Sequence, residues 1–404
     1  MNRRLLIAVA GVALVLLAVG SVLVAGAMGA FAGPLTPAEA GLELDSLLRG
    51  TVDGNAELHN GVLRVDAPDL GVEGAWAAGV ADERDGTPMT TATPFLSASI
   101  GKLFTAATVL SLADDGLLSL DDPITERLSP DVYSGLPVEG GDAALRDVTV
   151  RMLLGQRSGI PDYYDGATTD GAPNVFALLV DEPNREWTPL SLLAYTKAHF
   201  KAAGAPGEDF QYSDTNYDLL GLIVEKATGR PFHEVVAERV LVPLALRDTW
   251  YHAREDPPRP GLAPYADVWI GDTNVAHEPA LSLDWAGGGL ATTTADLDAL
   301  MRGLVDGKPV PLEALEENWT ENSLNRGIDY GYGLWRIRPA GVFFLLRGYP
   351  VLYGVSGSSG TFVYYVPKYD AVITGAFDQT DYAEGHVRFL LQVLALLGRV
   401  ERRS

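Results

Sequence analysis

The spacing of apolar residues divides the chain into a mostly helical middle and strand-forming ends. In six segments, apolar side chains recur every three or four positions, which is the spacing of one face of an α-helix. These predicted helices cover residues 103–114, 148–154, 189–203, 215–228, 232–241 and 294–305. A further apolar segment, 386–400, is predicted to close the chain as a helix.

Runs rich in valine, alanine and aromatic residues, bounded by glycine, proline and aspartate, predict strands. Two lie early in the chain, at 61–67 and 72–80, and four lie late, at 333–337, 342–347, 360–366 and 371–377. Strands at both ends with helices between them predict an α+β fold. We expect an antiparallel sheet built from both chain ends, flanked by helices, with a large and mostly helical insertion.

The N-terminal segment has the pattern of a membrane anchor. Arg3 and Arg4 precede an uncharged run whose apolar part, 5–31, is 27 residues long. That length can span a bilayer, and the two arginines orient the rest of the chain to the outside. We expect one uncleaved transmembrane helix, with secretion after cleavage near Ala30-Phe31-Ala32 as the alternative. The predicted division is an anchor or signal at 1–33, a linker at 34–44, a globular domain at 45–398 and a tail at 399–404.

Composition narrows the classes of function. Of 404 residues, 47% are hydrophobic and 21% charged, which indicates a globular protein rather than a disordered one. The net charge is −23 and no run of lysine and arginine is present, so nucleic acid is not an expected partner. The absence of cysteine excludes disulfides, thiolate catalysis and zinc sites built on cysteine.

Candidate chemistry begins at Ser99-Ile100-Gly101-Lys102, where a loop passes into the predicted helix 103–114. A spacing of three places a hydroxyl and an amine on one helix face. A buried lysine can lose its proton and then accept the proton of a serine nucleophile. Of the six lysines, only Lys102 has a serine three residues before it. Taken alone, this pattern also fits a capped helix with a surface lysine.

Two later segments offer further polar groups. Tyr212-Ser213-Asp214 precedes the predicted helix 215–228, and the glycine-rich run Val355-Ser356-Gly357-Ser358 precedes the predicted strand 360–366. A serine hydrolase needs a group that passes the proton to the leaving atom, and donors for the oxyanion. Glycine at the start of a strand lets a substrate backbone approach closely.

With these segments in this order, the chain resembles the serine β-lactamase and D,D-peptidase superfamily. The resemblance is to the class C β-lactamase-like branch, which also holds esterases and D-amino peptidases, and it covers about residues 45 to 395. Further matching segments are Leu-Leu-Gly-Gln-Arg-Ser-Gly-Ile-Pro at 153–161, Pro-Leu-Ala-Leu-Arg-Asp-Thr-Trp at 243–250, the Gly-Gly-Gly-Leu segment at 287–297, and Tyr-Gly-Tyr-Gly-Leu at 330–334.

The resemblance implies a role for each matching position. Ser99 would be the acylated nucleophile and Lys102 its proton acceptor. Tyr212 would protonate the leaving group and help to activate the deacylating water. The backbone N–H groups of Ser99 and Ser358 would form the oxyanion hole, and 355–357 would bind substrate. No metal or cofactor is implied.

Two positions depart from the family pattern. Asp214 stands where the family often has asparagine, so it keeps an acceptor and loses the amide donor. Its carboxylate is expected either to pair with Lys102, with the risk of keeping that lysine charged, or to cap the following helix. Asn216 is a candidate for the missing amide. Val355 stands where a lysine or histidine usually binds a substrate carboxylate, so uncharged esters or amides are expected to suffer less than carboxylate-bearing substrates.

Three hypotheses follow. The first is an extracytoplasmic, membrane-anchored serine hydrolase that forms an acyl-enzyme with a small-molecule or peptide substrate, whether ester, amide, D-amino peptide or β-lactam. The second is a catalytically weak or silent binding module on the same fold, for cell-wall or peptide fragments. The third, a structural envelope protein, accounts for the anchor and leaves the Ser-x-x-Lys motif unexplained. The sequence identifies no protein partner.

Overall fold

The computed structural model describes residues 33–262, 264–317, 319–382 and 385–401. The predicted transmembrane segment and its cleavage site lie outside these residues. Within the described part of the chain, no helix combines the length and the apolar character needed to cross a membrane.

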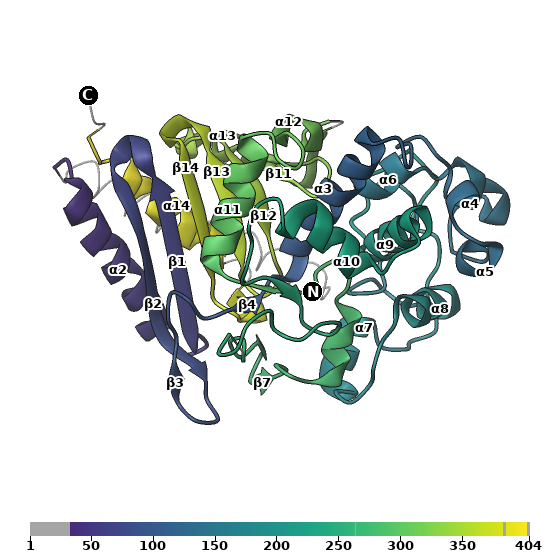
Figure 1. Ribbon diagram of the computed structural model, residues 1–404, viewed down its shortest axis with the longest axis horizontal. Helices are drawn as coiled ribbons and strands as arrows, with labels where there is room; N and C mark the ends of the chain where they lie inside the picture. The colour runs from purple at the N-terminus through teal and green to yellow at the C-terminus, as the bar shows by residue number, and fades with distance from the viewer. Residues whose placement is uncertain (1–32, 263, 318, 383–384, 402–404) are drawn as a thin grey trace, which may run out of the picture.

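A nine-stranded antiparallel sheet forms the core of one half of the molecule, on the left in Figure 1. Its order is β3-β2-β1-β14-β13-β12-β11-β10-β9, so the early strands pair with the last strand of the chain. The bounds are β1 Asn60–Ala67, β2 Val72–Asp82, β3 Thr87–Pro88, β9 Thr320–Asn325, β10 Ile328–Tyr330, β11 Trp335–Ile337, β12 Leu352–Ser356, β13 Phe362–Val366 and β14 Ala371–Ala376. The predicted α+β fold, with a sheet built from both chain ends, is confirmed.

One predicted strand is wrong. Residues 342–347 do not extend; they belong to the short helix α13 Pro339–Val342 and the 3-10 turn η6 Phe344–Leu346. The strand at this place in the sheet is instead β12, which follows Pro350. Its Gly354 is needed because a Cβ there would lie 1.9 Å from the carbonyl oxygen of Val363 on β13. The close approach of β12 to β13 therefore requires a glycine in β12. Because glycine is typical of loops, this run resembles a loop in the sequence.

The predicted linker 34–44 is also wrong in part. Helix α2 Pro37–Asp53 begins inside it, with Thr36 and Glu39 forming a capping box. The buried residues Ala40, Leu44, Leu48 and Val52 pack this helix against the sheet, and they follow the helical spacing that could have revealed it. The predicted tail is also partly ordered, because Leu35 forms a β-bridge with Val400.

The predicted helices are found, with the predicted ends at 232–241 and 294–305 and shifted ends in the others. They are α3 Gly101–Asp114, α6 Val150–Leu154, α8 Pro189–His199, α9 Asp214–Thr228, α10 Phe232–Val236 with the π-helix Ala237–Leu241, α11 Thr294–Val305 and α14 Gly385–Leu397. Further helical segments that were not predicted are α4 Ile124–Arg127, α5 Pro130–Tyr133, α7 Val175–Asp181 and α12 Leu312–Leu315. The short 3-10 turns are η1 Pro68–Leu70, η2 Ala98–Ile100, η3 Gly141–Asp147, η5 Pro279–Leu283, η7 Pro367–Tyr369 and η8 Thr380–Tyr382.

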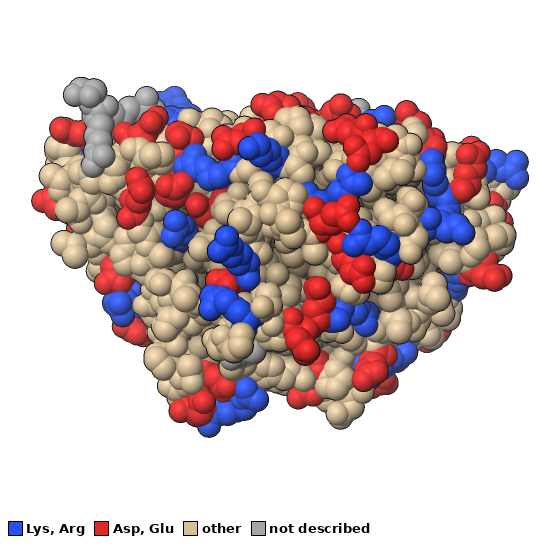
Figure 2. Space-filling view, in the orientation of Figure 1, with Lys and Arg blue, Asp and Glu red and all other residues tan. Residues whose placement is uncertain are grey.

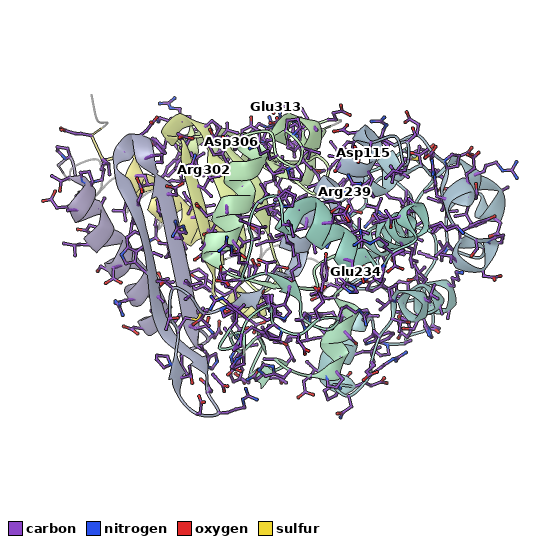
Figure 3. The ribbon with its side chains drawn as sticks, viewed as in Figure 1. Asp115, Glu234, Arg239, Arg302, Asp306 and Glu313 are labelled. Atoms are coloured by element: carbon purple, nitrogen blue, oxygen red, sulfur yellow. The ribbon has the colours of Figure 1, made fainter. Side chains whose placement is uncertain are left out.

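Helices cover both faces of the central sheet. Helices α2 and α14 pack together on one face, and α11 contacts β1, β13 and β14. Arg302 of α11, labelled in Figure 3, ties this helix to the sheet: its guanidinium bonds Asp66 at 2.7 Å and Asp370 at 2.7 Å. Most of the other helices form the second half of the molecule (Figure 1).

Two small sheets lie apart from the nine-stranded sheet. One has the order β4-β8-β5, from Phe95–Leu96, Leu290–Thr292 and Trp250–Tyr251, and the other joins β6 Trp269–Ile270 to β7 Thr273–Asn274. Strand β4 leads directly into the turn that carries Ser99, so β8 and β5 help to position it.

Candidate active site

Ser99 lies in a tight turn between β4 and helix α3, where η2 opens into the helix. The preceding residue, Ala98, has a φ of +46°, in the left-handed region that is costly for alanine. The turn is held by Ser97, whose N–H donates to Leu290 O at 2.8 Å and whose hydroxyl donates to Gly288 O at 2.5 Å. Contacts between distant segments therefore stabilise the conformation that presents Ser99.

Lys102 is buried beside Ser99, with 1% of its surface exposed, so the reading of a surface lysine is wrong. Its Nζ lies 3.2 Å from Ser99 Oγ, 2.5 Å from Asp214 Oδ1 and 3.1 Å from Gly287 O. Burial by itself would lower the pKa of Lys102, but the Asp214 carboxylate and the Tyr212 hydroxyl raise that pKa well above its usual value. The Asp214 carboxylate thus favours the ammonium form of Lys102.

Asp214 faces this ammonium. Ser213 occupies the N-cap position of α9 without a side-chain cap bond, and Asp214 is the first helical residue, so the capping role predicted for it is wrong. The carboxylate of Asp162, which is not part of the helix, accepts a hydrogen bond at the N-terminus of α9. The N–H of Asp214 donates to Asp162 Oδ1 at 2.8 Å. The pairing with Lys102, the other expectation for Asp214, is present.

Asn216 does not supply an amide to Ser99 or Lys102. Its Nδ2 donates to Gln156 Oε1 at 2.6 Å, and its Oδ1 accepts from the Ser158 hydroxyl at 2.6 Å. Asn216 is completely buried in this position. Its amide therefore holds the 156–158 segment to helix α9.

Tyr212 stands next to both predicted catalytic groups. The Lys102 Nζ lies 5.0 Å from the centre of its ring, and Tyr330 packs edge-on against that ring at 5.9 Å. Burial raises the pKa of Tyr212 to about 12, while Lys102 and a hydrogen bond with Ser99 oppose that rise. The hydroxyl is thus protonated at neutral pH and can donate a proton to a leaving group.

The segment from Val355 to Ser358 ends β12 and turns toward β13. Val355 is buried, with 1% exposure, in the same apolar cluster as Ile100 and Leu103, so no cation stands at this position. Gly357 is required by close packing, since a Cβ there would lie 2.8 Å from Ala98 Cβ. Ser358 lines a small cavity together with Ala98, which places the second predicted oxyanion donor beside the Ser99 turn.

Ser356 differs from its predicted role. Its hydroxyl lies 2.8 Å from the Tyr364 hydroxyl and 2.7 Å from His386 Nε2, and the residue is buried. These hydrogen bonds connect the Ser356 side chain to β13 and to helix α14, so they help to hold α14 against the sheet. The alternation of side chains along β12 explains this, because neighbours in a strand point to opposite faces.

Sequence reasoning missed several residues of the small cavity, among them Tyr164 and Asp284. Tyr164 hydrogen-bonds Ser358, although burial and then Asp284 raise its pKa above the usual range. Burial and the Asp214 charge raise the pKa of Asp284 to about 6. Both residues lie in loops just outside the recognised motifs, Tyr164 after the segment 153–161 and Asp284 before the segment 287–297. The one sequence signal is the position of Asp284 just before the Gly287-Gly288-Gly289 run.

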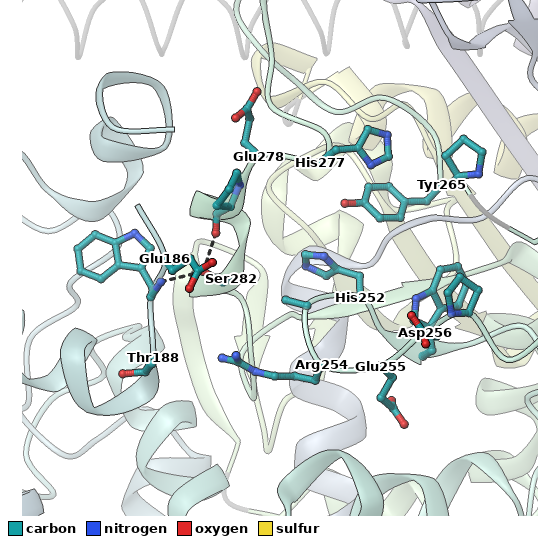
Figure 4. A pocket seen from close by; sticks show the side chains of 16 residues that line it. Glu186, Thr188, His252, Arg254, Glu255, Asp256, Tyr265, His277, Glu278 and Ser282 are labelled. Atoms are coloured by element: carbon teal, nitrogen blue, oxygen red, sulfur yellow. Dashed lines mark hydrogen bonds between the residues drawn. The ribbon is translucent and has the colours of Figure 1, made fainter. Parts of the chain in front are cut away.

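A larger cavity, of about 580 Å³, lies elsewhere and is shown in Figure 4. His252, Arg254 and Ser282 are among the side chains around it, and burial followed by the charge of Arg254 lowers the pKa of His252 to about 4. None of the predicted catalytic residues lines it. The smaller cavity of about 30 Å³ is lined by Ala98 and Ser358 but by none of Ser99, Lys102 and Tyr212. We therefore place the candidate active site by the contacts among those three residues.

The described residues include no group of three or more histidine, aspartate or glutamate side chains arranged to hold a metal ion. The arrangement that is present joins a serine hydroxyl, a buried ammonium, a carboxylate and a protonated phenol. These groups are suited to acyl transfer through a covalent serine ester.

Known proteins share both the sequence pattern and the fold. Residues 9–396 match the β-lactamase family. Penicillin-binding protein 4* of Bacillus subtilis is 27% identical over 271 residues, which are 63% of this chain and 55% of that protein. Protein flp of Staphylococcus aureus is 28% identical over 51% of this chain and 37% of its own length. The chain thus matches only about half, or less, of these relatives.

Solved structures extend the comparison. A D-stereospecific amidohydrolase from Streptomyces is 25% identical, with a TM-score of 0.64 over 84% of this chain and 94% of that one. The D-amino acid amidase of Ochrobactrum anthropi, 23% identical, has a TM-score of 0.71 over 89% of this chain and 98% of that one. At that identity the second likeness shows the fold alone.

The chain belongs to the β-lactamase family. Proteins similar to it include a penicillin-binding protein and a D-stereospecific amidohydrolase.

Proposed function

We propose that this protein hydrolyses amides or esters through an acyl-enzyme on Ser99. The observation that carries this proposal is the contact of 3.2 Å between Ser99 Oγ and the buried Lys102 Nζ, with Tyr212 packed against both. A hydroxyl with a buried amine and a protonated phenol beside it has the groups needed to accept and return a proton.

The proposed reaction has two stages. Ser99 Oγ attacks the carbonyl carbon, and the N–H groups of Ser99 and Ser358 stabilise the oxyanion. The hydroxyl proton passes through Lys102 and Tyr212 to the leaving nitrogen or oxygen, and the carbonyl carbon stays bound to Oγ as an ester. Water then attacks this ester, and the Tyr212 hydroxyl gives its proton to Ser99 Oγ as it accepts one from the water, which releases a carboxylic acid and free Ser99.

The Lys102–Asp214 ion pair limits the rate of this reaction. Lys102 accepts a proton only after losing one, and the carboxylate at 2.5 Å favours the ammonium form. For acylation, the Nζ proton must move to Asp214 Oδ1 as Nζ accepts the proton of Ser99. This ion pair also favours the second candidate, a weak or silent binding module for cell-wall or peptide fragments.

Val355 directs the choice of substrate. The position usually occupied by a cation is filled by a buried valine, so a substrate carboxylate would lose its partner. We propose uncharged or cationic amides and esters as substrates, with D-amino peptides ahead of β-lactams. The similarity to a D-stereospecific amidohydrolase from Streptomyces, 25% identical, supports this order.

Intact-mass spectrometry of the full chain tests this proposal. The protein, purified in detergent, is exposed to a fluorophosphonate and separately to a penicillin, with Ser99→Ala as the control. We expect one fluorophosphonate adduct that is absent from Ser99→Ala, and weaker labelling by penicillin. No adduct on folded protein would favour the binding module instead, and an adduct that persists in Ser99→Ala would place the nucleophile elsewhere.

A further inference from the structure

An exposed apolar segment connects β11 to β12. Among the described residues, nine large hydrophobic side chains are exposed, and three of them, Phe344, Leu345 and Val351, belong to this one segment. Phe344 is 66% exposed, and Phe343 packs against it with ring centres 5.0 Å apart. Exposed apolar side chains gathered in this way indicate a surface that contacts a partner. We call residues 343–351 the apolar loop.

The strand register places the apolar loop at one end of the nine-stranded sheet. β11 ends at Ile337, which pairs with Leu352 at the start of β12. Because β12 and β13 are antiparallel, β13 ends where β12 begins, and the turn η7 follows it there. Tyr349 of the apolar loop packs against the apolar cluster that contains Tyr369 of η7. The apolar loop and η7 therefore share one end of the sheet, the upper end in Figure 1.

The chain enters the domain at the same end of the sheet. Leu35 forms a β-bridge with Val400, and its N–H donates to Arg399 O at 2.9 Å. The neighbouring Gly398 reaches η7, since a Cβ there would lie 3.2 Å from the Tyr369 hydroxyl. Leu35 and the apolar loop thus lie on either side of η7.

Only a short connection separates this end of the sheet from the apolar run 5–31. Leu35 is four residues beyond residue 31, and a fully extended chain of four residues spans at most about 14 Å. The sequence predicts that the run 5–31 crosses a bilayer, with the rest of the chain outside. With so short a connection, the end of the sheet that holds Leu35 would lie at the bilayer surface.

From this arrangement we propose that the apolar loop inserts into the surface of the bilayer that residues 5–31 cross. The side chains of Phe344 and Leu345 then extend about 5–10 Å into the boundary between headgroups and acyl chains. Tyr349 has a ring and a hydroxyl, which suit the apolar and polar sides of that boundary. Because the chain is acidic, attraction to anionic headgroups contributes little, and the contact depends on the apolar side chains. The inference rests on the predicted span and is independent of the proposed catalytic function.

This contact orients the candidate active site relative to the bilayer. Strand β12 begins at the end of the sheet that carries the apolar loop and runs from Leu352 to Ser356. Its far end, four residues along at about 3.3 Å each, is about 13 Å away. The segment 355–358 and the Ser99 turn that packs against Gly357 therefore lie farther from the bilayer than the apolar loop does.

A fluorescent label on the apolar loop tests this contact. The full chain has no cysteine, so one introduced cysteine is labelled uniquely. Phe344→Cys, carrying a nitrobenzoxadiazole label, is reconstituted in phosphatidylcholine nanodiscs with and without doxyl-labelled phosphatidylcholine. We expect the doxyl lipid to quench this label at least about two-fold, because the label reaches the acyl boundary. Leu190→Cys is the matched control: this exposed leucine belongs to α8, far from α13 in Figure 1, and its label should not be quenched.

Three results would overturn the proposal. An unquenched label at residue 344 with the emission of an aqueous environment would show that the apolar loop lies in water. An unquenched label with the emission of an apolar environment would show that protein covers the loop, either residues 5–31 or a second copy of the chain. Equal quenching at 344 and 190 would show that the contact is not made by the apolar loop. Fluorophosphonate labelling of Ser99 reports on the proposed function separately, so a failure of one does not count against the other.

Discussion

Lys102 and Asp214 form a buried ion pair. The family pattern often has asparagine at position 214, so in this protein a carboxylate oxygen replaces the amide nitrogen. An asparagine would offer Lys102 a neutral acceptor, whereas the aspartate offers a negative charge 2.5 Å from Nζ. Burial and the carboxylate act on the pKa of Lys102 in opposite directions, and the carboxylate prevails. The charge state of the proton acceptor is thus decided at one residue.

Asp214→Asn is expected to accelerate acylation of Ser99. Without the carboxylate, burial lowers the pKa of Lys102, so the neutral amine appears at lower pH. Each unit by which the pKa falls multiplies the neutral fraction about ten-fold. The pH dependence of fluorophosphonate labelling should shift toward lower pH, with a rate at pH 7 at least about ten-fold higher. The exposed Asp209→Asn serves as control; an unchanged profile in Asp214→Asn would show that Lys102 does not limit acylation.

At the scale of elements, the site depends on the close approach of the β12–β13 turn to the turn before α3. Thr361 Oγ1 donates to Ser97 O at 3.1 Å, and Gly357 packs between these segments. A Cβ at position 357 would lie 2.2 Å from Thr361 Oγ1, so the hydroxyl that holds the Ser97 turn would have to move. The glycine therefore has a packing role that supports the position of Ser99.

Gly357→Ala should reduce both stability and labelling. We expect a loss of about 1–3 kcal/mol in the free energy of unfolding, as for other overpacked sites, measured by denaturant titration. Labelling of Ser99 should fall even where the protein remains folded, because the turn is displaced. Gly348→Ala is the matched control, since a Cβ there meets nothing within 4 Å, and its stability should change by less than about 0.5 kcal/mol. Full labelling of a stable Gly357→Ala protein would refute this account.

At the scale of the whole molecule, acidic side chains outnumber basic ones, 53 to 30. On the face shown in Figure 2, the basic side chains lie among acidic ones. A surface of this charge does not attract polyanions, and the absence of a nucleic-acid partner stays a prediction. We propose that this acidic domain stands outside the cytoplasm, held by the segment 5–31.

Cell fractionation tests this location. Full-length protein is expected in the membrane fraction, with its domain accessible to protease added to intact cells. A variant without residues 1–32 should appear in the soluble cytosolic fraction. Release of the full-length form into the medium would instead indicate cleavage near residues 30–32, and protection from the protease in intact cells would contradict the proposed orientation.

The local pattern of the sequence was enough to predict most elements near the site. In helices such as 294–305, apolar residues recur every three or four positions and so form one face. This spacing follows from the number of residues in each turn of an α-helix. The same holds for Ser99 and Lys102, whose separation of three fixes their shared face. Strands at both chain ends with helices between them predicted the α+β fold, and the resemblance carried by the motif order predicted that Ser99, Lys102 and Tyr212 belong to one site.

Other features were decided only by the tertiary structure. Strand β12 exists because β11 and β13 pair with it, although its glycine-containing sequence resembles a loop. The carboxylate of Asp214 had two possible partners in sequence, and the approach of α9 to α3 selected Lys102 over the helix end. Asp284 and Tyr164 lie on separate loops that meet in the folded protein. No local pattern in the sequence predicts that these two loops come together. Sequence determines what is set by neighbours along the chain, whereas charge states and cavity linings depend on which distant segments fold together.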